Sequence, residues 1–170
     1  MAHRRNPIDI VYSWMGKSYG GDFYSNKRSS TSLTYKFKDE IMPHYAYGWE
    51  DEYYSLNGVD RIIHMINRIR QYHVSSYKKL SEKNKKQVLF VSFEKLAYDT
   101  YDVIPDITTF LNTKSSKYTQ KILQEERCPR VYNPKSIERK LNVIKNKSSK
   151  LSLDLLMNMA YEFEHNSIVV

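Results

Sequence analysis

Apolar residues in this chain form long helical stripes and one short unbroken run. The longest stripe covers residues 59–80, where apolar side chains recur at i, i+3, i+4 and i+7 and predict an amphipathic helix. Residues 87–93 are a short apolar run, typical of a strand that is buried on both faces of a parallel sheet. Because a long helix leading into such a strand is the order of a βαβ unit, we predict an α/β fold with helices flanking a parallel sheet.

The second half of the chain is predicted to be rich in helices. Apolar stripes indicate helices over residues 101–112 and 136–147, and a last helix that begins at Ser152 as its capping residue. In the first half, residues 33–42 are expected to form a short helix that ends at Pro43, and residues 16–32 a loop. The composition, with 41% hydrophobic residues, agrees with a single globular domain over residues 1–170.

The amino-terminal residues have the pattern of a strand that turns into a helix. Residues 1–4 have the length of a strand end, Asn6 can cap a helix, and Pro7 suits the first helical position. Arg5 then stands at the mouth of the turn, where its guanidinium, the free N–H groups of the helix start and the helix dipole favour an anion. Ser13, about two turns along, has a hydroxyl that could reach the same anion. The alternative is that Arg5 pairs with a carboxylate and that Ser13 only caps or packs.

Charge and cysteine content narrow the classes of function. The net charge of +8 suits an anionic partner such as a nucleotide, a phosphate group, a sulfated glycan, a nucleic acid or a membrane surface. A single cysteine, Cys128, excludes an intramolecular disulfide and a cysteine-based zinc site, and no metal is expected. Because no run approaches the ~20 apolar residues of a membrane span and no signal core precedes Arg5, the sequence predicts a cytoplasmic protein without a membrane span.

Five residues near the amino terminus match the signature of an enzyme family. Arg5, Asn6, Pro7, Asp9 and Ser13 are in register with R-[DN]-P-x-D-x-x-x-S, and the segment resembles the sulfotransferases that use 3′-phosphoadenosine 5′-phosphosulfate (PAPS). In that family the Arg and Ser of the signature hold the 3′-phosphate. The resemblance therefore implies PAPS as co-substrate, held by Arg5 and Ser13. It also implies a P-loop-like fold, with a three-layer parallel sheet flanked by helices.

Two later segments are similar to the same family. Residues 88–96, followed by Asp99 and a helix ending in Phe110-Leu111, resemble the family's run of a strand, Tyr/Phe-Glu-x-Leu, an acidic turn and a helix. This similarity implies that Phe93 lies beside the adenine. The Arg139-Lys140 pair is similar to the family's last conserved segment, whose basic residues return to the 3′-phosphate. The alternative for this pair is an exposed basic face of a helix.

The sequence departs from the family at the other side of the nucleotide. Family members open with a strand, a loop that cradles the 5′-phosphosulfate and a helix, but G-x-x-x-x-G-K-[ST] occurs nowhere in this chain. The lysine of that loop and the base that takes the acceptor proton have no counterpart, so the catalytic residues are unknown. We expect an incomplete, carboxyl-terminal part of a sulfotransferase domain. Its helices would expose apolar faces, and the isolated chain would tend to aggregate.

The resemblance implies an enzyme that moves a sulfuryl group from PAPS to a hydroxyl or amine acceptor. The acceptor classes left open are a carbohydrate, a lipid, a peptide and a small alcohol, and no nucleic acid is expected as partner. The alternatives are a basic protein that binds nucleic acid or another polyanion, and a catalytically inactive remnant. Residues 45–54, which mix aromatic and acidic side chains, either wall an acceptor pocket or cover the core.

Overall fold

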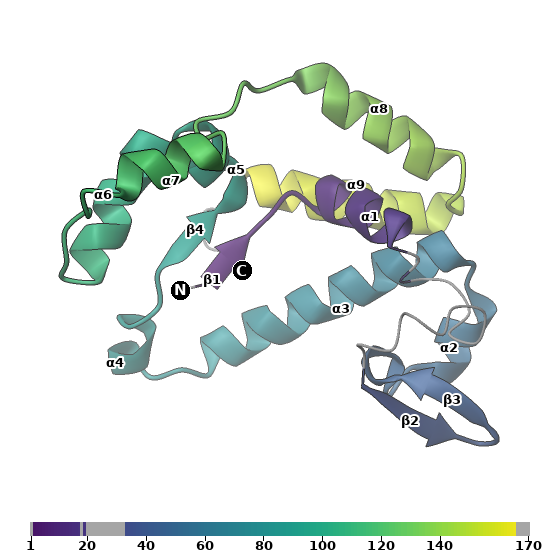
Figure 1. The fold of residues 1–170 in the computed structure, drawn as a ribbon. Helices are drawn as coiled ribbons and strands as arrows, with labels where there is room; N and C mark the ends of the chain where they lie inside the picture. The colour runs from purple at the N-terminus through teal and green to yellow at the C-terminus, as the bar shows by residue number, and fades with distance from the viewer. Residues whose placement is uncertain (1, 18, 20–32, 166–170) are drawn as a thin grey trace.

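The structure, a computed structural model, describes residues 2–17, 19 and 33–165. It is a mixed α/β fold in which helices prevail (Figure 1). The strands and the short 3₁₀ helix are β1 (Ala2–Arg4), β2 (Thr34–Phe37), β3 (Glu40–Pro43), η1 (His44–Ala46) and β4 (Phe90–Ser92). The α-helices are α1 (Pro7–Gly16), α2 (Glu50–Ser55), α3 (Gly58–Lys78), α4 (Glu82–Lys85), α5 (Phe93–Tyr98), α6 (Thr100–Phe110), α7 (Thr119–Glu125), α8 (Pro134–Lys145) and α9 (Lys150–His165).

β1 and β4 form a parallel pair, although they are far apart in the sequence. Ala2 pairs with Phe90 and Arg4 with Ser92, and α3 is the long helix between the two strands. The two strands expected at residues 1–4 and 87–93 are therefore present, and the structure shows that they pair directly with each other. Among the described residues this sheet has two strands, so the three-layer parallel sheet implied by the resemblance is not part of the structure described here.

Residues 33–42 form an antiparallel hairpin, so the short helix expected there is wrong. β2 and β3 pair with Phe37 opposite Glu40, and Lys38, with φ of 54°, lies in the turn between them. Tyr35 and Phe37 are half-buried and pack against a core cluster, whereas Thr34 and Lys36 are exposed. This alternation, together with aromatic side chains that suit a pleated surface, favours a strand over a helix.

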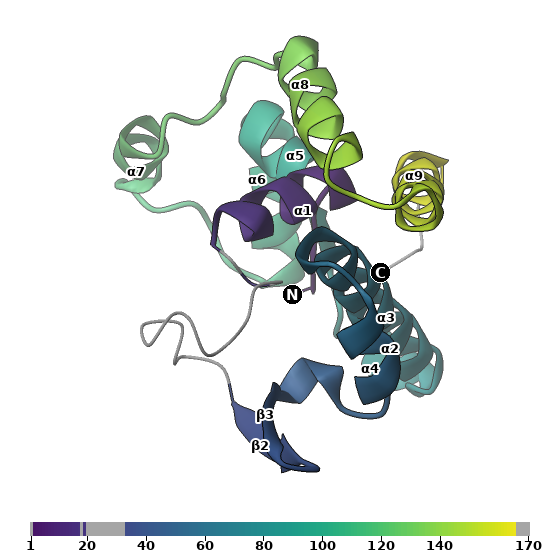
Figure 2. The same cartoon turned by 90° about the vertical axis from the view of Figure 1, so that its right-hand side faces the viewer.

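α1 lies at the centre of the main hydrophobic core. Figures 1 and 2 show α1 beside α3, α8 and α9, and it contacts all three helices. The amphipathic helix predicted over residues 59–80 is confirmed as α3, and its apolar stripe faces this core. The buried members of the cluster are Ile8, Val11, Ile62, Ile63, Ile66, Ile144, Leu156, Met159 and Ala160.

The last helix begins earlier than predicted. α9 starts at Lys150, and Ser152 lies inside its first turn with 1% of its surface exposed. The hydroxyl oxygen of Ser149 accepts the backbone N–H of Ser152 at 3.3 Å, so the capping contact comes from Ser149. The prediction of Ser152 as the cap is therefore wrong. Ser149 and Ser152 have the same local preference for a capping position, and the structure uses Ser149.

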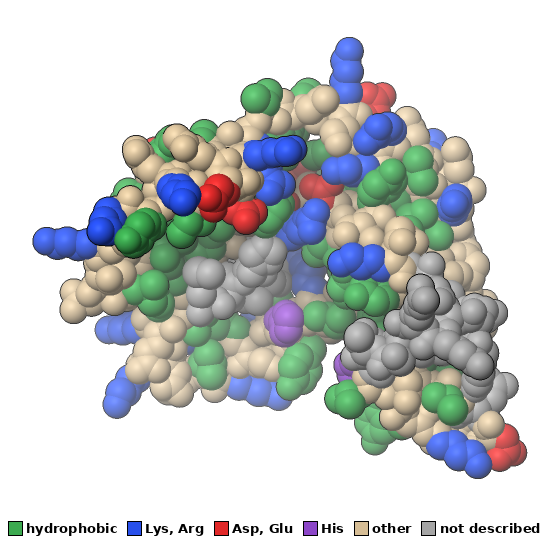
Figure 3. All heavy atoms as spheres, viewed as in Figure 1, with side chains coloured by type: hydrophobic (Ala, Val, Ile, Leu, Met, Phe, Trp, Pro, Cys, Tyr) green, Lys and Arg blue, Asp and Glu red, His purple; other side chains and the backbone are tan. Residues whose placement is uncertain are grey.

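Apolar side chains remain exposed on the arm formed by α5, α6 and α7. Figure 3 shows hydrophobic side chains on the surface over α6 and α7. This exposure agrees with the apolar faces expected from the sequence, and aggregation of the chain stays a prediction. No helix in the described part of the chain has the length and apolar character needed to cross a membrane. The side chains on this arm that are more than half exposed are Tyr101, Leu111, Tyr118, Ile122, Val131 and Tyr132.

Candidate anion-binding site

The carboxyl ends of the parallel strands bring Arg5 and Phe93 together. Because Arg4 pairs with Ser92, the next residue of each strand leaves the sheet at the same edge. The guanidinium carbon of Arg5 lies 4.8 Å from the centroid of the Phe93 ring, which is a cation–π contact. Open α/β sheets bind ligands at this edge, so two residues singled out in the sequence meet where a ligand can bind.

Glu94 fastens the end of β4 to the start of α1. Its Oε1 accepts the backbone N–H of Asn6 at 2.7 Å, and its Oε2 accepts the hydroxyl of Ser92 at 3.0 Å. The side-chain oxygen of Asn6 accepts the N–H of Ile8 at 2.9 Å, and Pro7 stands at the start of the helix, as predicted. Glu94 thus fixes the strand-to-helix turn and brings a negative charge to the positive end of the helix dipole.

The backbone of α1 is less open to an anion than the sequence indicates. The N–H groups of Asn6 and Ile8 are bonded to side chains, Pro7 has no N–H, and the N–H of Ile10 donates to the carbonyl of Asn6 at 3.1 Å. An anion at this edge would therefore be held mainly by guanidinium groups. The amides of Asn6 and Ile8 are thus not free as expected, and the Asn6 amide is taken by Glu94, from a segment 88 residues away.

Arg5 carries a buried donor without a partner. No described atom accepts a hydrogen bond from its Nε, and an ion pair with a carboxylate, the alternative considered for this residue, is not present among the described residues. An unpaired buried polar atom costs about 1–3 kcal/mol. A phosphate or sulfate beside Arg5 would remove this cost and add charge-assisted hydrogen bonds.

A second guanidinium lies over the same ring. Arg130, in the segment between α7 and α8, has its guanidinium carbon 5.9 Å from the centroid of Phe93. Its backbone N–H donates to the carbonyl of Ala97 in α5 at 2.7 Å, which holds this segment against α5. We call Arg5, Phe93 and Arg130 the strand-end site. Sequence reasoning missed Arg130, since no local pattern there indicates a contact with the end of β4.

Basic side chains also gather around this part of the surface. Figure 3 shows Lys and Arg side chains near the junction of α1, α5 and α8. Lys140 of α8 donates from Nζ to Oδ1 of Asp9 at 2.6 Å, and the two side chains are 22% and 11% exposed. Lys140 thus reaches the first turn of α1, but its charge is matched by Asp9. Arg139 is exposed, which agrees with the alternative of a basic helix face.

Ser13 lies in the second half of α1, the helix that follows Arg5. It stands six residues beyond Pro7 in α1, a rise of about 9 Å along the helix. It follows Asp9 by four residues and so shares the stripe of α1 on which Asp9 meets Lys140. The structure joins Arg5 with Phe93, and Asp9 with Lys140, while the shared anion of Arg5, Ser13 and Arg139 stays a prediction.

A hollow with different chemistry lies at the other end of α1. Its volume is about 670 Å³, and aromatic side chains form most of its wall. Trp49 and Tyr53 are buried in a core cluster, which agrees with the core-covering role expected for residues 45–54. Tyr45 and Tyr47 line this hollow, and a role as an acceptor wall stays a prediction. We call it the aromatic cleft, and it is lined by Trp14, Tyr19, His44, Tyr45, Tyr47, Met65, Arg68, Ile69, Tyr72 and His73.

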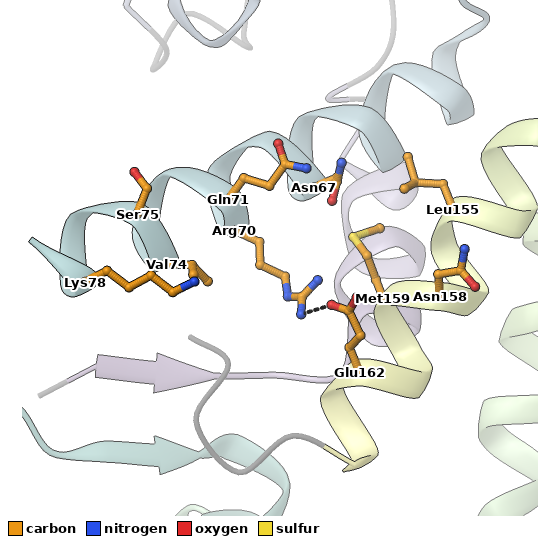
Figure 4. Close-up of a pocket in the computed structure, with 10 residues that line it drawn as sticks. All are labelled: Asn67, Arg70, Gln71, Val74, Ser75, Lys78, Leu155, Asn158, Met159 and Glu162. Atoms are coloured by element: carbon orange, nitrogen blue, oxygen red, sulfur yellow. Dashed lines mark hydrogen bonds and ion pairs between the residues drawn. The ribbon is translucent and has the colours of Figure 1, made fainter.

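A smaller, more polar cavity lies between α3 and α9. It has a volume of about 460 Å³, and Figure 4 shows Arg70 and Glu162 pointing toward each other across it. The two side chains form an ion pair, and amide side chains from both helices surround it. Because this arginine already has a carboxylate partner, the cavity has less capacity for an anion than the strand-end site.

Ser152, His64 and Glu52 form a line that resembles the order of groups in a hydrolase triad. The Ser152 hydroxyl lies 3.2 Å from Nε2 of His64, whose Nδ1 lies 2.8 Å from Oε1 of Glu52. The hydroxyl of Ser149 also donates to that of Ser152, and Ser152 is 1% exposed. Since a substrate has no access to this hydroxyl, the line acts as a brace between α2, α3 and α9.

No protein-family model, curated protein or solved structure matches this chain. Within residues 2–17, 19 and 33–165 there is also no group of three or more His, Cys, Asp or Glu side chains that could hold a metal ion. The functional argument therefore depends on the chemistry of the strand-end site itself.

Proposed function

We propose that this chain binds the 3′-phosphoadenosine part of PAPS at the strand-end site and acts in sulfuryl transfer to a hydroxyl or amine acceptor. The observation that carries the proposal is the buried, unpartnered Nε of Arg5 beside the Phe93 ring. A guanidinium suits a phosphate, and the face of an aromatic ring suits a purine. A 3′-phosphorylated adenosine carries both of these groups.

In this proposal the basic residues have different tasks. Arg5 holds the 3′-phosphate, Phe93 lies against the adenine, and Arg130 adds a second guanidinium at the same ring. Lys140 positions α8 against α1 through Asp9, so it supports the site instead of touching the nucleotide. Arg139, exposed on α8, remains the cation of that helix that can turn toward a bound phosphate.

The proposed reaction is a transfer between two nucleophiles. The acceptor oxygen or nitrogen forms a bond to sulfur, the bond from sulfur to the bridging phosphate oxygen breaks, and the acceptor proton passes to a base. The nucleotide leaves as 3′-phosphoadenosine 5′-phosphate (PAP). We assign none of the described residues to the base or to the bridging oxygen, so the proposal concerns the 3′ side of the nucleotide and is tested by binding.

The test compares PAP with AMP, which lacks the 3′-phosphate. Calorimetry on the full chain is expected to show a preference for PAP, and Arg5→Ala is expected to weaken PAP binding by about 30- to 150-fold, or about 2–3 kcal/mol. The same variant should leave AMP binding nearly unchanged, because AMP has no 3′-phosphate for Arg5 to hold. Equal PAP affinity in the variant and the wild type would remove the assignment.

The salt dependence of binding separates the proposal from its main alternative. A general polyanion binder would lose affinity steeply with added salt and would show no preference for PAP over AMP. A protein with the proposed site still prefers PAP over AMP at physiological salt, although the ratio narrows as salt screens the contact with the 3′-phosphate. The titrations should therefore be repeated at low and at physiological salt.

A further inference from the structure

We propose that the aromatic cleft is a second ligand site, which takes a small planar aromatic molecule bearing an acidic group. The cleft lies at the opposite end of α1 from Arg5, and the ten residues of α1 span about 15 Å. Binding there uses none of the residues of the strand-end site. The inference is therefore independent of the proposed function.

The size and floor of the cleft suit a small molecule. A volume of about 670 Å³ lies within the range of about 300–1,000 Å³ that is usual for such sites. The floor is apolar, with Met65 2% exposed and Ile69 half-buried beside it. A ring seated on this floor loses its contact with water, which gives the favourable part of binding.

The aromatic walls are held in place by contacts with one another. Trp14 and Tyr19 meet edge to face with ring centroids 5.4 Å apart, and His44 and Tyr45 meet in the same way at 5.4 Å. The hydroxyl of Tyr45 donates to the carbonyl of Tyr19 at 3.1 Å, which joins the two pairs. Walls that are fixed before binding cost little conformational entropy when a ligand ring packs against them.

Two tyrosines stand at the rim of the cleft. The side chains of Tyr47 and Tyr72 are 78% and 70% exposed. Single exposed tyrosines are common on protein surfaces, but these two border a hollow that three further aromatic residues line. They offer both ring faces and hydroxyl groups to a ligand, so the rim favours a molecule with an aromatic ring.

The guanidinium of Arg68 offers hydrogen-bond donors to an acidic group in the cleft, although its charge is shared with Glu52. None of the described lining residues is acidic, and Arg68 contributes a permanent positive charge. One N–H of Arg68 donates to Glu52 at 2.7 Å, and its guanidinium carbon lies 4.6 Å from the centroid of the Trp49 ring. These contacts fix the guanidinium and leave other N–H donors for a carboxylate, sulfate or phosphate on the ligand.

The polar cavity between α3 and α9 differs from the aromatic cleft in the two properties that would favour an aromatic acid. That cavity has no aromatic residue in its described lining, and its arginine, Arg70, is paired with Glu162 inside the cavity. In the cleft, Glu52 is not among the described lining residues, so the carboxylate partner of Arg68 does not occupy the space offered to a ligand.

The experiment measures the binding of three probes to the full chain by calorimetry. 2-Naphthoate has a planar ring and a carboxylate, 2-naphthol has the ring alone, and cyclohexanecarboxylate has the acid on a saturated ring. We expect saturable binding of 2-naphthoate at one site, about tenfold or more tighter than that of either other probe. Absence of saturable 2-naphthoate binding would overturn the proposal.

Variants then locate the bound probe. Arg68→Met is expected to weaken 2-naphthoate about tenfold and to leave 2-naphthol unchanged, since only the former has an anionic group. Tyr72→Ala should weaken both about threefold, and because its side chain is 70% exposed the variant should fold normally. Tyr101→Ala, at a 58% exposed tyrosine on α6, is the matched control and should change neither.

Two results decide the inference and separate it from the proposed function. If Arg68→Met and Tyr72→Ala both bind 2-naphthoate as the wild type does, the probe sits elsewhere and the inference is wrong. Arg5→Ala is expected to retain full 2-naphthoate affinity while losing PAP. If the wild-type protein binds 2-naphthoate but does not bind PAP, only the proposed function is contradicted.

Discussion

The two ends of α1 are surrounded by different kinds of side chain, while the middle of the helix is buried in the core. At the amino end, two guanidinium groups lie over the Phe93 ring. At the carboxyl end, aromatic rings surround a hollow with one guanidinium in its wall. Between them Ile8 and Val11 are 5% and 0% exposed in the core. A short helix can thus hold two surfaces of different chemistry, because the core fixes both of its ends at once.

The two ends are also held by different kinds of contact. The amino end depends on polar contacts with distant segments, such as the Lys140 and Asp9 pair, which joins residues 131 positions apart. The carboxyl end depends on ring packing and on the bond from Tyr45 to the carbonyl of Tyr19, 26 positions away. Changes at the amino end should therefore act through charge, and changes at the carboxyl end through burial.

The largest effect is expected from a charge placed in the shared middle. Val11→Asp would bury a carboxylate at a position that is 0% exposed and has apolar neighbours, which costs more than about 4 kcal/mol and should unfold the chain. Far-UV circular dichroism should show loss of helix, and both PAP and 2-naphthoate should fail to bind. The matched control is Leu151→Asp, at a 76% exposed position in the first turn of α9, which should keep the native spectrum. A folded Val11→Asp variant would contradict the idea of a common anchor.

The features predicted well from the sequence have local causes. The capping oxygen of Asn6 and the fixed φ of Pro7 act within one turn, so the start of α1 is where the sequence indicates. The apolar stripe of α3 is equally local, since it repeats every three to four residues. The strand β4 lies within the short apolar run at residues 87–93, which is also a local pattern.

The features that were missed depend on packing between distant segments. The hairpin within residues 33–43 is stabilised because Tyr35 and Phe37 pack against a core cluster that includes Met65 of α3. The contact of Arg130 with Phe93 and the bond of Glu94 to Asn6 join separate parts of the chain. A local pattern cannot encode such contacts, so the sequence predicted part of the strand-end site and none of the groups that complete it.

An intermediate effect is expected from the ion pair at the amino end. Lys140→Met would leave the carboxylate of Asp9, whose side chain is 11% exposed, without its partner and should lower the free energy of unfolding by about 1–3 kcal/mol. Arg139→Met, at the neighbouring exposed position, should change it by no more than about 0.5 kcal/mol. Urea unfolding of both variants measures the difference. If both lose the same stability, Lys140 has no special role in positioning α8.

The smallest effect at neutral pH is expected at the carboxyl end, from Tyr45→Phe. The variant loses the hydrogen bond to the carbonyl of Tyr19, which should cost about 0.5–1.5 kcal/mol in the free energy of unfolding at pH 7. Burial raises the pKa of the Tyr45 hydroxyl far above its usual value of 10.0, and the neighbouring Tyr53 raises it further. The folded state therefore keeps this proton longer than the unfolded state does.

The sign of this pKa shift gives a pH dependence that sharpens the comparison. Stabilisation by a hydroxyl whose pKa is raised on folding is complete below about pH 10 and is lost as the pH rises above that value. The wild type should lose stability between pH 9 and pH 11 more steeply than Tyr45→Phe, as measured by urea unfolding at each pH. Tyr72→Phe, at a 70% exposed rim position, should follow the wild type. Burial also raises the pKa of Tyr35, but that contribution is common to all three proteins and cancels in the difference. Parallel curves for the wild type and Tyr45→Phe would show that the carboxyl end of α1 is open to water, and the fixed aromatic wall of the cleft would then have to be abandoned.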